Sequence, residues 1–215
     1  MANGNEDGRN LHLMTTAGYL TRNRILGVKD RLQNVQFASS YGASEIGVMT
    51  VDRNPDGNLH VGKPIFGKPI WLSSVNDEGV GKVTTSGPDC REFYMDGEQI
   101  RSQDGTVSST DLAHFDENGN LYLDGRLDSG QKYRGVLVYP RRIERHILKN
   151  DKIVDAKVKI IDGQGISQDV LAATVVGDVT EDKVRTQCES LPDSIRPNKF
   201  IVKNEREAYS NRGKM

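Results

Sequence analysis

The feature that most constrains the fold of this chain is a dense series of turn segments between Asp52 and Asp124. Short stretches rich in Gly, Asp and Asn recur there as NPDGN, NDEG, SGPD, MDGE, SQDG and DENGN. Short apolar runs lie between them, and this alternation is typical of β-hairpins. The runs IWLSSV, GKVTTS, REFYM and NLYLD are therefore the expected strands of a small antiparallel sheet or partial barrel.

The segments on either side of this region have a different pattern. Leu20 to Leu32 is predicted to be a short helix, because its apolar residues fall roughly on one face. A strand, VQF, then leads into the small-residue turn ASSYGASE. After Asp128 the chain changes to two strand and helix pairs: KYRGVLV then PRRIERHILKN, and DAKVKIID with VLAATVVG then TEDKVRTQCESL. Pro140 suits a first helical turn.

The fold class predicted from these patterns is α+β. Residues 1–127 are expected to form an antiparallel, β-rich part, and residues 128–215 a small α+β lobe. The boundary is placed in GRLDSG, where glycines bracket charged residues and a hinge is sterically easy.

Composition excludes several classes of protein. Lys and Arg total 29 against 30 Asp and Glu, so the chain as a whole does not attract nucleic acid or an anionic membrane. Cys90 and Cys188 form no CxxC pair, which argues against zinc ribbons and thioredoxin chemistry and favours a reduced, cytoplasmic setting. No stretch approaches the ~20 apolar residues of a membrane span, and the polar start lacks the apolar core of a secretory signal.

Two stretches imitate a phosphate-binding loop and are rejected. Gly57 to Lys63 and Gly62 to Lys68 both fit GxxxxGK, but Pro64 and Pro69 follow them. The loop needs a Ser or Thr hydroxyl at that position to hold magnesium. Hairpin turns are the better interpretation.

The segment Tyr41 to Glu45 contains the residue types that a nucleotide site uses. An aromatic ring stacks on a base, glycine permits close backbone approach, and a carboxylate binds Mg²⁺ beside phosphates. Taken alone, the segment is explained better by an ordinary turn with a helix cap at Ser44. Four further motifs change that balance: Ser109-Thr110-Asp111, Asp124 to Asp128, Lys132 to Gly135, and Asn211 to Lys214.

In this order the motifs resemble the adenylate-forming superfamily of acyl-CoA synthetases, luciferases and peptide-synthetase adenylation domains, whose patterns are YGxTE, TGD, GRxD, KxRG and a terminal GK. Val61 to Pro64, Ser86 to Pro88 and the YPxxIE pattern from Tyr139 agree with it. The resemblance runs from about Thr16 to Lys214 and corresponds to the C-terminal half of such enzymes. It implies that residues 1–127 end the large domain and that residues 128–215 form a swinging lobe.

The resemblance implies a role for each matching residue. Tyr41 would pack on adenine within a nucleotide-binding segment that includes Gly42 and Ser44. Glu45 would be a catalytic carboxylate on Mg²⁺, and Asp111 would accept a hydrogen bond from a ribose hydroxyl, with Arg126 also on the ribose. Asp128 would be the hinge, and Ala17 and Gly18 would line the acid pocket.

Lys214 would be the catalytic lysine that bridges the acid's carboxylate and the α-phosphate. Attack of a carboxylate on ATP brings two anions together, so a mobile cation between them is needed. Without the other motifs, a frayed basic tail would be the better interpretation of Lys214.

This chain departs from the family pattern in three places. Ser44 replaces the commoner Thr, Thr110 replaces Gly, and the family's phosphate loop and most of its acid pocket would lie before the matched region. A leader segment, a natural split point and a truncation are all compatible with the polar start. The segment from Arg126 to Asn150 carries seven Lys and Arg against two acids, so contact with a polyanion there is one alternative and simple solvation the other.

The implied activity is that of an AMP-forming acid–thiol ligase. ATP with Mg²⁺ would activate a carboxylic acid as an acyl-adenylate, and coenzyme A or the phosphopantetheine of a carrier protein would accept the acyl group. The partners would be the missing N-terminal half and possible acyl or peptidyl carrier proteins, with no nucleic acid. The alternative is a non-catalytic nucleotide-binding or carrier-docking fragment without the phosphate loop. The four His residues have no ligand or triad spacing, so surface or packing roles are expected for them.

Overall fold

The computed structural model describes residues 11–15, 20–32, 34–43, 46–88, 90, 93–96, 99–102, 105–161 and 169–204. The chain separates into two compact units. The first comprises Met1–Leu20 and Ile25–Leu127, and the second comprises Thr21–Arg24 and Asp128–Met215. The predicted α+β class is confirmed, since strands dominate and most strand pairs are antiparallel. The assignment of residues 1–127 to a larger domain and of residues 128–215 to a swinging lobe stays a prediction.

The first sheet of the first unit has the strand order β1-β2-β3-β4. Strand β1 (Leu11–Thr15) runs parallel to β2 (Val35–Ala43), and α1 (Arg22–Lys29) lies between them in the sequence. Strands β3 (Gly47–Asp52) and β4 (Lys63–Pro64) continue the sheet antiparallel. The helix predicted from Leu20 to Leu32 is present as α1. It is shorter than predicted, because the chain turns at residues 30–32.

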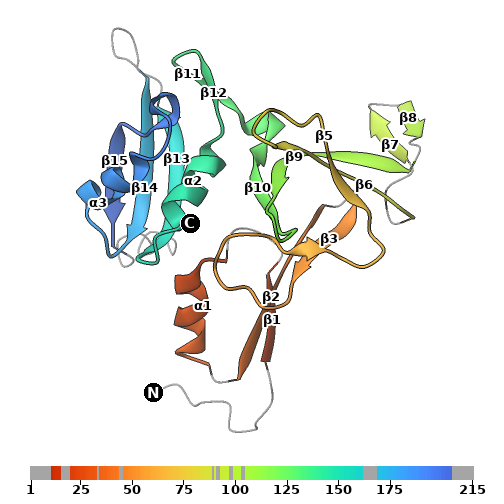
Figure 1. Cartoon of the computed structure of the whole chain (residues 1–215), viewed down its shortest axis with the longest axis horizontal. Coiled ribbons are helices and arrows are strands. Elements are labelled where there is room, and N and C mark those ends of the chain that lie inside the picture. The colour runs from red at the N-terminus through yellow and green to blue at the C-terminus, as the bar shows by residue number, and fades with distance from the viewer. Residues whose placement is uncertain are drawn as a thin grey trace. The chain divides into compact units, whose positions relative to one another are not determined.

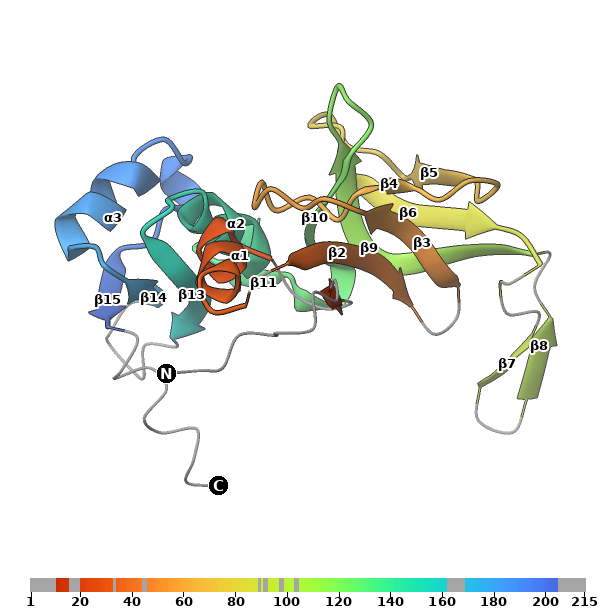
Figure 2. The same ribbon diagram turned by 90° about the horizontal axis from the view of Figure 1, so that it is seen from below.

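The second sheet has the order β10-β9-β6-β5 and is antiparallel throughout. Its strands are β5 (Ile70–Ser73), β6 (Gly81–Ser86), β9 (Thr106–Phe115) and β10 (Leu121–Arg126). A separate hairpin of β7 (Phe93–Asp96) and β8 (Gln99–Ser102) projects beyond the ends of β6 and β9 (Figures 1 and 2). The four strands predicted in this region are present, while β9 is the longest strand of the sheet and was not predicted.

The two sheets of the first unit share one buried core. Its residues come from both sheets and from the segments that join them: Tyr41, Ile46, Met49, Val61, Val83, Cys90, Val107, Ala113, Leu121 and Leu123. The two stretches that imitate a phosphate loop lie beside this core. Lys63 is in the short strand β4, which pairs with β3 across the first stretch. Lys68 follows the turn that joins β4 of the first sheet to β5 of the second, so the second stretch is a turn between sheets and not the predicted hairpin.

The turn between β9 and β10 is held by one carboxylate. Asp116 Oδ1 accepts hydrogen bonds from the backbone N–H of Asn118 at 2.9 Å and of Asn120 at 2.8 Å. Its Oδ2 accepts from the side-chain amide of Asn120 at 2.9 Å. The Asn120 amide, first among several causes, lowers the pKa of Asp116. These bonds fix the hairpin that brings β10 beside β9.

The second unit begins with a hairpin. A single strand was predicted for KYRGVLV, and that prediction is wrong: β11 (Gln131–Tyr133) pairs with β12 (Val136–Val138). Arg134 and Gly135 lie between them with φ angles of 48° and 83°. Two successive left-handed residues are the geometry of a tight two-residue hairpin turn, and glycine adopts it without strain. The chain therefore reverses where the sequence pattern looked continuous.

The remainder of the second unit is a three-stranded sheet with two helices. Its elements are α2 (Pro140–Leu148), β13 (Ile153–Ile161), β14 (Val170–Gly177), α3 (Glu181–Cys188) and β15 (Lys199–Lys203). The strand order is β13-β14-β15, with β14 and β15 parallel. Both helices lie on one face of the sheet (Figure 2). The predicted helices and the strands β13 and β14 are confirmed, whereas β15 was not predicted.

Polar contacts fix α2 in this layer. The buried Glu144 accepts the backbone N–H of Val158 at 2.9 Å and lies 3.3 Å from the Lys157 amine, which ties α2 to the edge strand β13. At the end of α2, the side-chain amide of Gln187 in α3 donates to the carbonyls of His146 and Ile147 at 2.7 and 3.1 Å. The same carbonyls accept only longer bonds from the backbone N–H groups of Lys149 at 3.4 Å and Asn150 at 3.2 Å, so the Gln187 amide completes the cap of α2.

No helix in the described part of the chain is both long and apolar enough to cross a membrane.

Candidate nucleotide site

A hydrogen bond joins two of the predicted nucleotide-binding residues. Tyr41 on β2 donates its hydroxyl to Oδ2 of Asp111 on β9 at 2.7 Å, across a sequence separation of 70 residues. The Tyr41 ring is 7% exposed and belongs to the buried core. Asp111 is only partly buried, and its own N–H is bonded to Ser109 Oγ at 3.0 Å. The core therefore holds the tyrosine, and the tyrosine holds one oxygen of the carboxylate.

Arg126 lies directly opposite Asp111. The antiparallel register of β10 and β9 pairs Arg126 with Asp111 and Gly125 with Leu112. Side chains of residues that face each other in such a pair are neighbours on the sheet. Tyr41, Asp111 and Arg126 therefore form one contiguous group in the first unit, although they come from three separate motifs.

Gly42 adjoins this group at a point where no side chain fits. A Cβ atom at Gly42 would lie 2.3 Å from the carbonyl oxygen of Gly47 and 3.0 Å from Cα of Val48. The close approach of β2 and β3 leaves no room for such an atom, because the contacting atoms are backbone. The glycine therefore allows the backbone of β3 to pack directly against the strand after Tyr41.

The other predicted site residues have different outcomes. Asp128 lies in the 3₁₀ turn Leu127–Ser129 at the start of the second unit. Ala17, Gly18, Ser44, Glu45 and Lys214 lie outside the described residues. Thr110, which replaces the family's glycine, is an exposed residue of β9, where a β-branched side chain is well accommodated. The roles assigned to all these residues stay predictions.

A buried carboxylate and a histidine lie near the same hairpin and were missed by sequence reasoning. His114 Nδ1 is 2.6 Å from Oδ2 of Asp124, whose side chain is buried. The β10 strand contains a bulge between Leu123 and Gly125, so that Asp124 turns toward the protein. The His114 ring stacks on Tyr122 with the centroids 5.3 Å apart. Spacing in the sequence gave no indication of this pair, because the bulge brings its members together.

A second histidine packs against the same tyrosine. His60 meets Tyr122 edge-on with the centroids 5.8 Å apart, and its Nδ1 lies 3.4 Å from Asp52 Oδ2. The backbone N–H of Gly62 donates to the same Nδ1 at 3.2 Å. No group of three or more metal-binding side chains is present in the part of the chain that the structure describes. The packing roles expected for histidines fit both residues.

The group formed by Tyr41, Asp111 and Arg126 is able to bind hydroxyl groups of a ligand. Asp111 has a second carboxylate oxygen that is able to accept a hydrogen bond from a diol, and Arg126 is the residue paired with Asp111 on the neighbouring strand. These features suit a ribose.

Known proteins with similar sequences include a luciferin monooxygenase, a CoA ligase and a gramicidin S synthase. The chain is 30% identical to luciferin 4-monooxygenase of Photuris pensylvanica over 164 residues, which cover 69% of this chain and 30% of that protein. It is 31% identical to 2-succinylbenzoate–CoA ligase of Bacillus mycoides (strain KBAB4) over 160 residues, or 68% of this chain and 32% of that protein. Gramicidin S synthase 2 of Aneurinibacillus migulanus is 24% identical over 91% of this chain and 5% of that protein. No protein-family model matches the chain.

Solved structures share the fold. The anthranilate CoA ligase AuaEII in complex with anthranoyl-AMP superposes with a TM-score of 0.66 at 18% identity, over 89% of this chain and 40% of that one. O-succinylbenzoate coenzyme A synthetase from Bacillus subtilis, in complex with ATP and magnesium ion, gives a TM-score of 0.61 at 19% identity, over 89% and 42%. The chain thus spans less than half the length of the relatives and structures that it matches. Together with the ordered motifs, these matches show that the chain is a member of the adenylate-forming superfamily and corresponds to the C-terminal part of its enzymes.

Proposed function

We propose that this chain is the C-terminal part of an ATP-dependent ligase that activates a carboxylic acid as an acyl-adenylate and then transfers the acyl group to a thiol. The thiol belongs to coenzyme A or to the phosphopantetheine of a carrier protein. The observation that carries the proposal is the Tyr41–Asp111 hydrogen bond of 2.7 Å, with Arg126 opposite Asp111. It unites three motifs of the family in one place.

Each residue of the group has a distinct role in this proposal. Asp111 accepts a hydrogen bond from a ribose hydroxyl through the oxygen that Tyr41 does not occupy. Tyr41 positions that carboxylate and is proposed to pack on adenine, and Gly42 allows β3 to pack closely beside it. Glu45 is proposed to hold Mg²⁺ beside the phosphates. Ala17 and Gly18 are proposed to line the acid pocket.

The proposal is tested first by binding of AMP to the 215-residue chain, measured by calorimetry and by ligand-observed NMR. These residues contain no phosphate loop, so we expect a dissociation constant weaker than ~1 μM, which corresponds to about −8 kcal/mol. Asp111→Asn should weaken AMP binding about tenfold, because the amide no longer offers a charged acceptor. Tyr41→Phe should have a smaller effect, since it removes only the positioning bond.

The matched control is Asp77→Asn, which makes the same chemical change in an exposed turn of the same unit. It should leave AMP affinity unchanged. Equal affinities for the Asp111→Asn and Asp77→Asn variants would overturn the ribose assignment. Formation of acyl-adenylate when the chain is combined with a segment that carries the phosphate loop would support the ligase, and AMP binding without that activity would favour the non-catalytic alternative.

A further inference from the structure

The bulge in β10 determines which residue lies opposite Asp111. Up to Leu123, β10 pairs with β9 in a regular register, and after the bulge Arg126 lies opposite Asp111. If the regular register continued without the bulge, Arg126 would lie opposite Thr110 instead. A slip of one residue moves a side chain to the other face of a sheet. The extra residue, Asp124, is therefore what places Arg126 beside Asp111.

The part of β10 before the bulge is anchored by a segment outside its own sheet. The backbone N–H of Val61 donates to the carbonyl of Leu121 at 2.8 Å, and the N–H of Leu121 donates to the carbonyl of Gly62 at 2.9 Å. The strand cannot slide along β9 at this point without breaking both bonds. The position of Arg126 therefore depends on how the chain passes through the bulge.

His114 holds the bulged residue. The side chain of Asp124 is only 6% exposed, and its Oδ2 lies 2.6 Å from His114 Nδ1. An ionised carboxylate only accepts hydrogen bonds, so Nδ1 is the donor. The imidazole ring is itself fixed, because it stacks on Tyr122 with an angle of 9° between the ring planes. A buried carboxylate that loses a donor is disfavoured, so Asp124 stays where this ring reaches it.

These contacts connect the histidine to the nucleotide group. We propose that His114 is a positioning residue for the nucleotide site: its bond to Asp124 holds the bulge, and the bulge sets Arg126 opposite Asp111. The inference rests on the proposed function, in which Arg126 contacts the ribose. His114 acts only through the backbone of β10 and itself contacts no ligand.

The first test follows the register by cross-strand NOEs in the 215-residue chain. The NOEs should connect Arg126 with Asp111 in the unaltered chain and with Thr110 in His114→Phe, because phenylalanine keeps the stacked ring but offers no donor to the bulged carboxylate. His114→Asn should restore the contacts with Asp111, since its amide nitrogen corresponds to Nδ1. His114→Gln, whose amide nitrogen corresponds to Nε2, should behave like His114→Phe and takes its place if that variant does not fold.

The second test measures whether His114 acts through Arg126. Arg126→Gln should weaken AMP binding about tenfold, and His114→Phe should weaken it by about the same factor. The double variant should lose no more than about tenfold, because without the bulge the guanidinium is already displaced. Two independent roles would instead multiply to about 100-fold.

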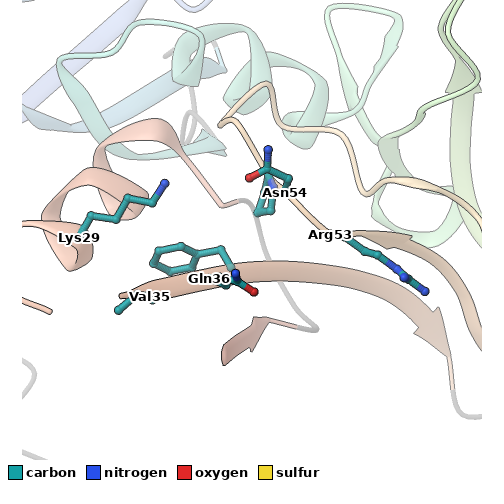
Figure 3. Close-up of a pocket in the computed structure, with 7 residues that line it drawn as sticks. Lys29, Val35, Gln36, Arg53 and Asn54 are labelled. Atoms are coloured by element: carbon teal, nitrogen blue, oxygen red, sulfur yellow. The ribbon is translucent and has the colours of Figure 1, made fainter. Parts of the chain in front are cut away.

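The matched control for Arg126 is Arg53, another exposed arginine of the same unit. Arg53 lines a hollow of about 370 Å³ at the start of β2, and Figure 3 shows its side chain directed away from Lys29 and Asn54. The polar groups of this hollow therefore do not converge on one ligand. Arg53→Gln should leave AMP affinity within about threefold of the unaltered chain, and its effect should multiply with that of His114→Phe.

The control for the ring is His60→Phe, which keeps an aromatic side chain at the edge of Tyr122. It should leave the NOEs between Arg126 and Asp111 unchanged, and their loss would show that packing on Tyr122 alone sets the register. Unchanged NOEs in both His114→Phe and His114→Gln, or a 100-fold loss in the double variant, would overturn the positioning role. The NOEs require no nucleotide. An Arg126→Gln variant with unaltered AMP affinity would therefore count against the proposed function, whereas the NOEs decide the role of His114.

Discussion

Strands β2 and β3 approach each other closely at Gly42, next to the group formed by Tyr41, Asp111 and Arg126, and leave no space there for a Cβ atom. Its neighbour Tyr41 is fixed by the core, and Asp111 is fixed by Tyr41. The backbone at Gly42 therefore positions the Tyr41 ring, and the Tyr41 hydroxyl positions the Asp111 carboxylate. A change at Gly42 should disturb all three.

Gly42→Ala is predicted to destabilise the first unit by at least about 2 kcal/mol, because two strands must separate to relieve a contact of 2.3 Å with backbone. Gly27→Ala is the matched control. A Cβ at Gly27 meets nothing within 4 Å, and the residue is in α1, so the same substitution should stabilise by roughly 0.5–1 kcal/mol. Urea unfolding of both variants measures the difference, and effects of the same sign would contradict it.

Among the elements, α2 and β14 were predictable and β9 was not. The helix has an apolar stripe after Pro140, and β14 is an apolar run, so local pattern and tertiary environment agree. Strand β9 has the sequence TVSSTDLAHF, whose polar residues obscure the pattern of a strand. It belongs to the sheet because it pairs with β10 and β6 on its two sides. The His114–Asp124 pair depends on a bulge, which sequence periodicity does not reveal.

The C-terminal end of α3 provides a pH-dependent test of the packing of this element. Burial raises the pKa of Cys188 from 9.0 to about 11, against a smaller lowering by Arg196. The folded state thus keeps the thiol protonated after the unfolded chain has lost its proton. Stability from this source is complete below pH 9 and is lost as the pH rises toward 11, by at most ~2.7 kcal/mol.

Cys188→Ala should remove that part of the pH dependence. Its free energy of unfolding should be lower than that of the unaltered chain at pH 8, because a buried side chain is truncated. The difference between the free energies of unfolding of the variant and of the unaltered chain should then narrow between pH 9 and pH 11. Chemical unfolding at several pH values measures this, and two parallel curves would show that the thiol does not ionise differently in the two states.

For the whole molecule, the second compact unit includes Thr21–Arg24 and otherwise begins at Asp128, within the 3₁₀ turn Leu127–Ser129. We propose that the second unit delivers Lys214 for adenylation and then rotates about Asp128 for thioester formation. The order of these steps follows from charge. A lysine is needed where the carboxylate and the α-phosphate oxygens converge, and it is not needed once the adenylate exists.

The last prediction separates these two steps in the chain combined with a segment that carries the phosphate loop. Lys214→Ala should slow acyl-adenylate formation by roughly 10²- to 10³-fold, or about 3 to 4 kcal/mol, and spare thioester formation from a pre-made adenylate. Asp128→Pro should show the converse pattern, because proline fixes the φ angle about which the second unit would turn. Pyrophosphate exchange measures the first step and single-turnover thioester formation the second. Equal losses in both steps for Lys214→Ala would reject its bridging role, and no loss in either would make Lys214 part of a frayed basic tail.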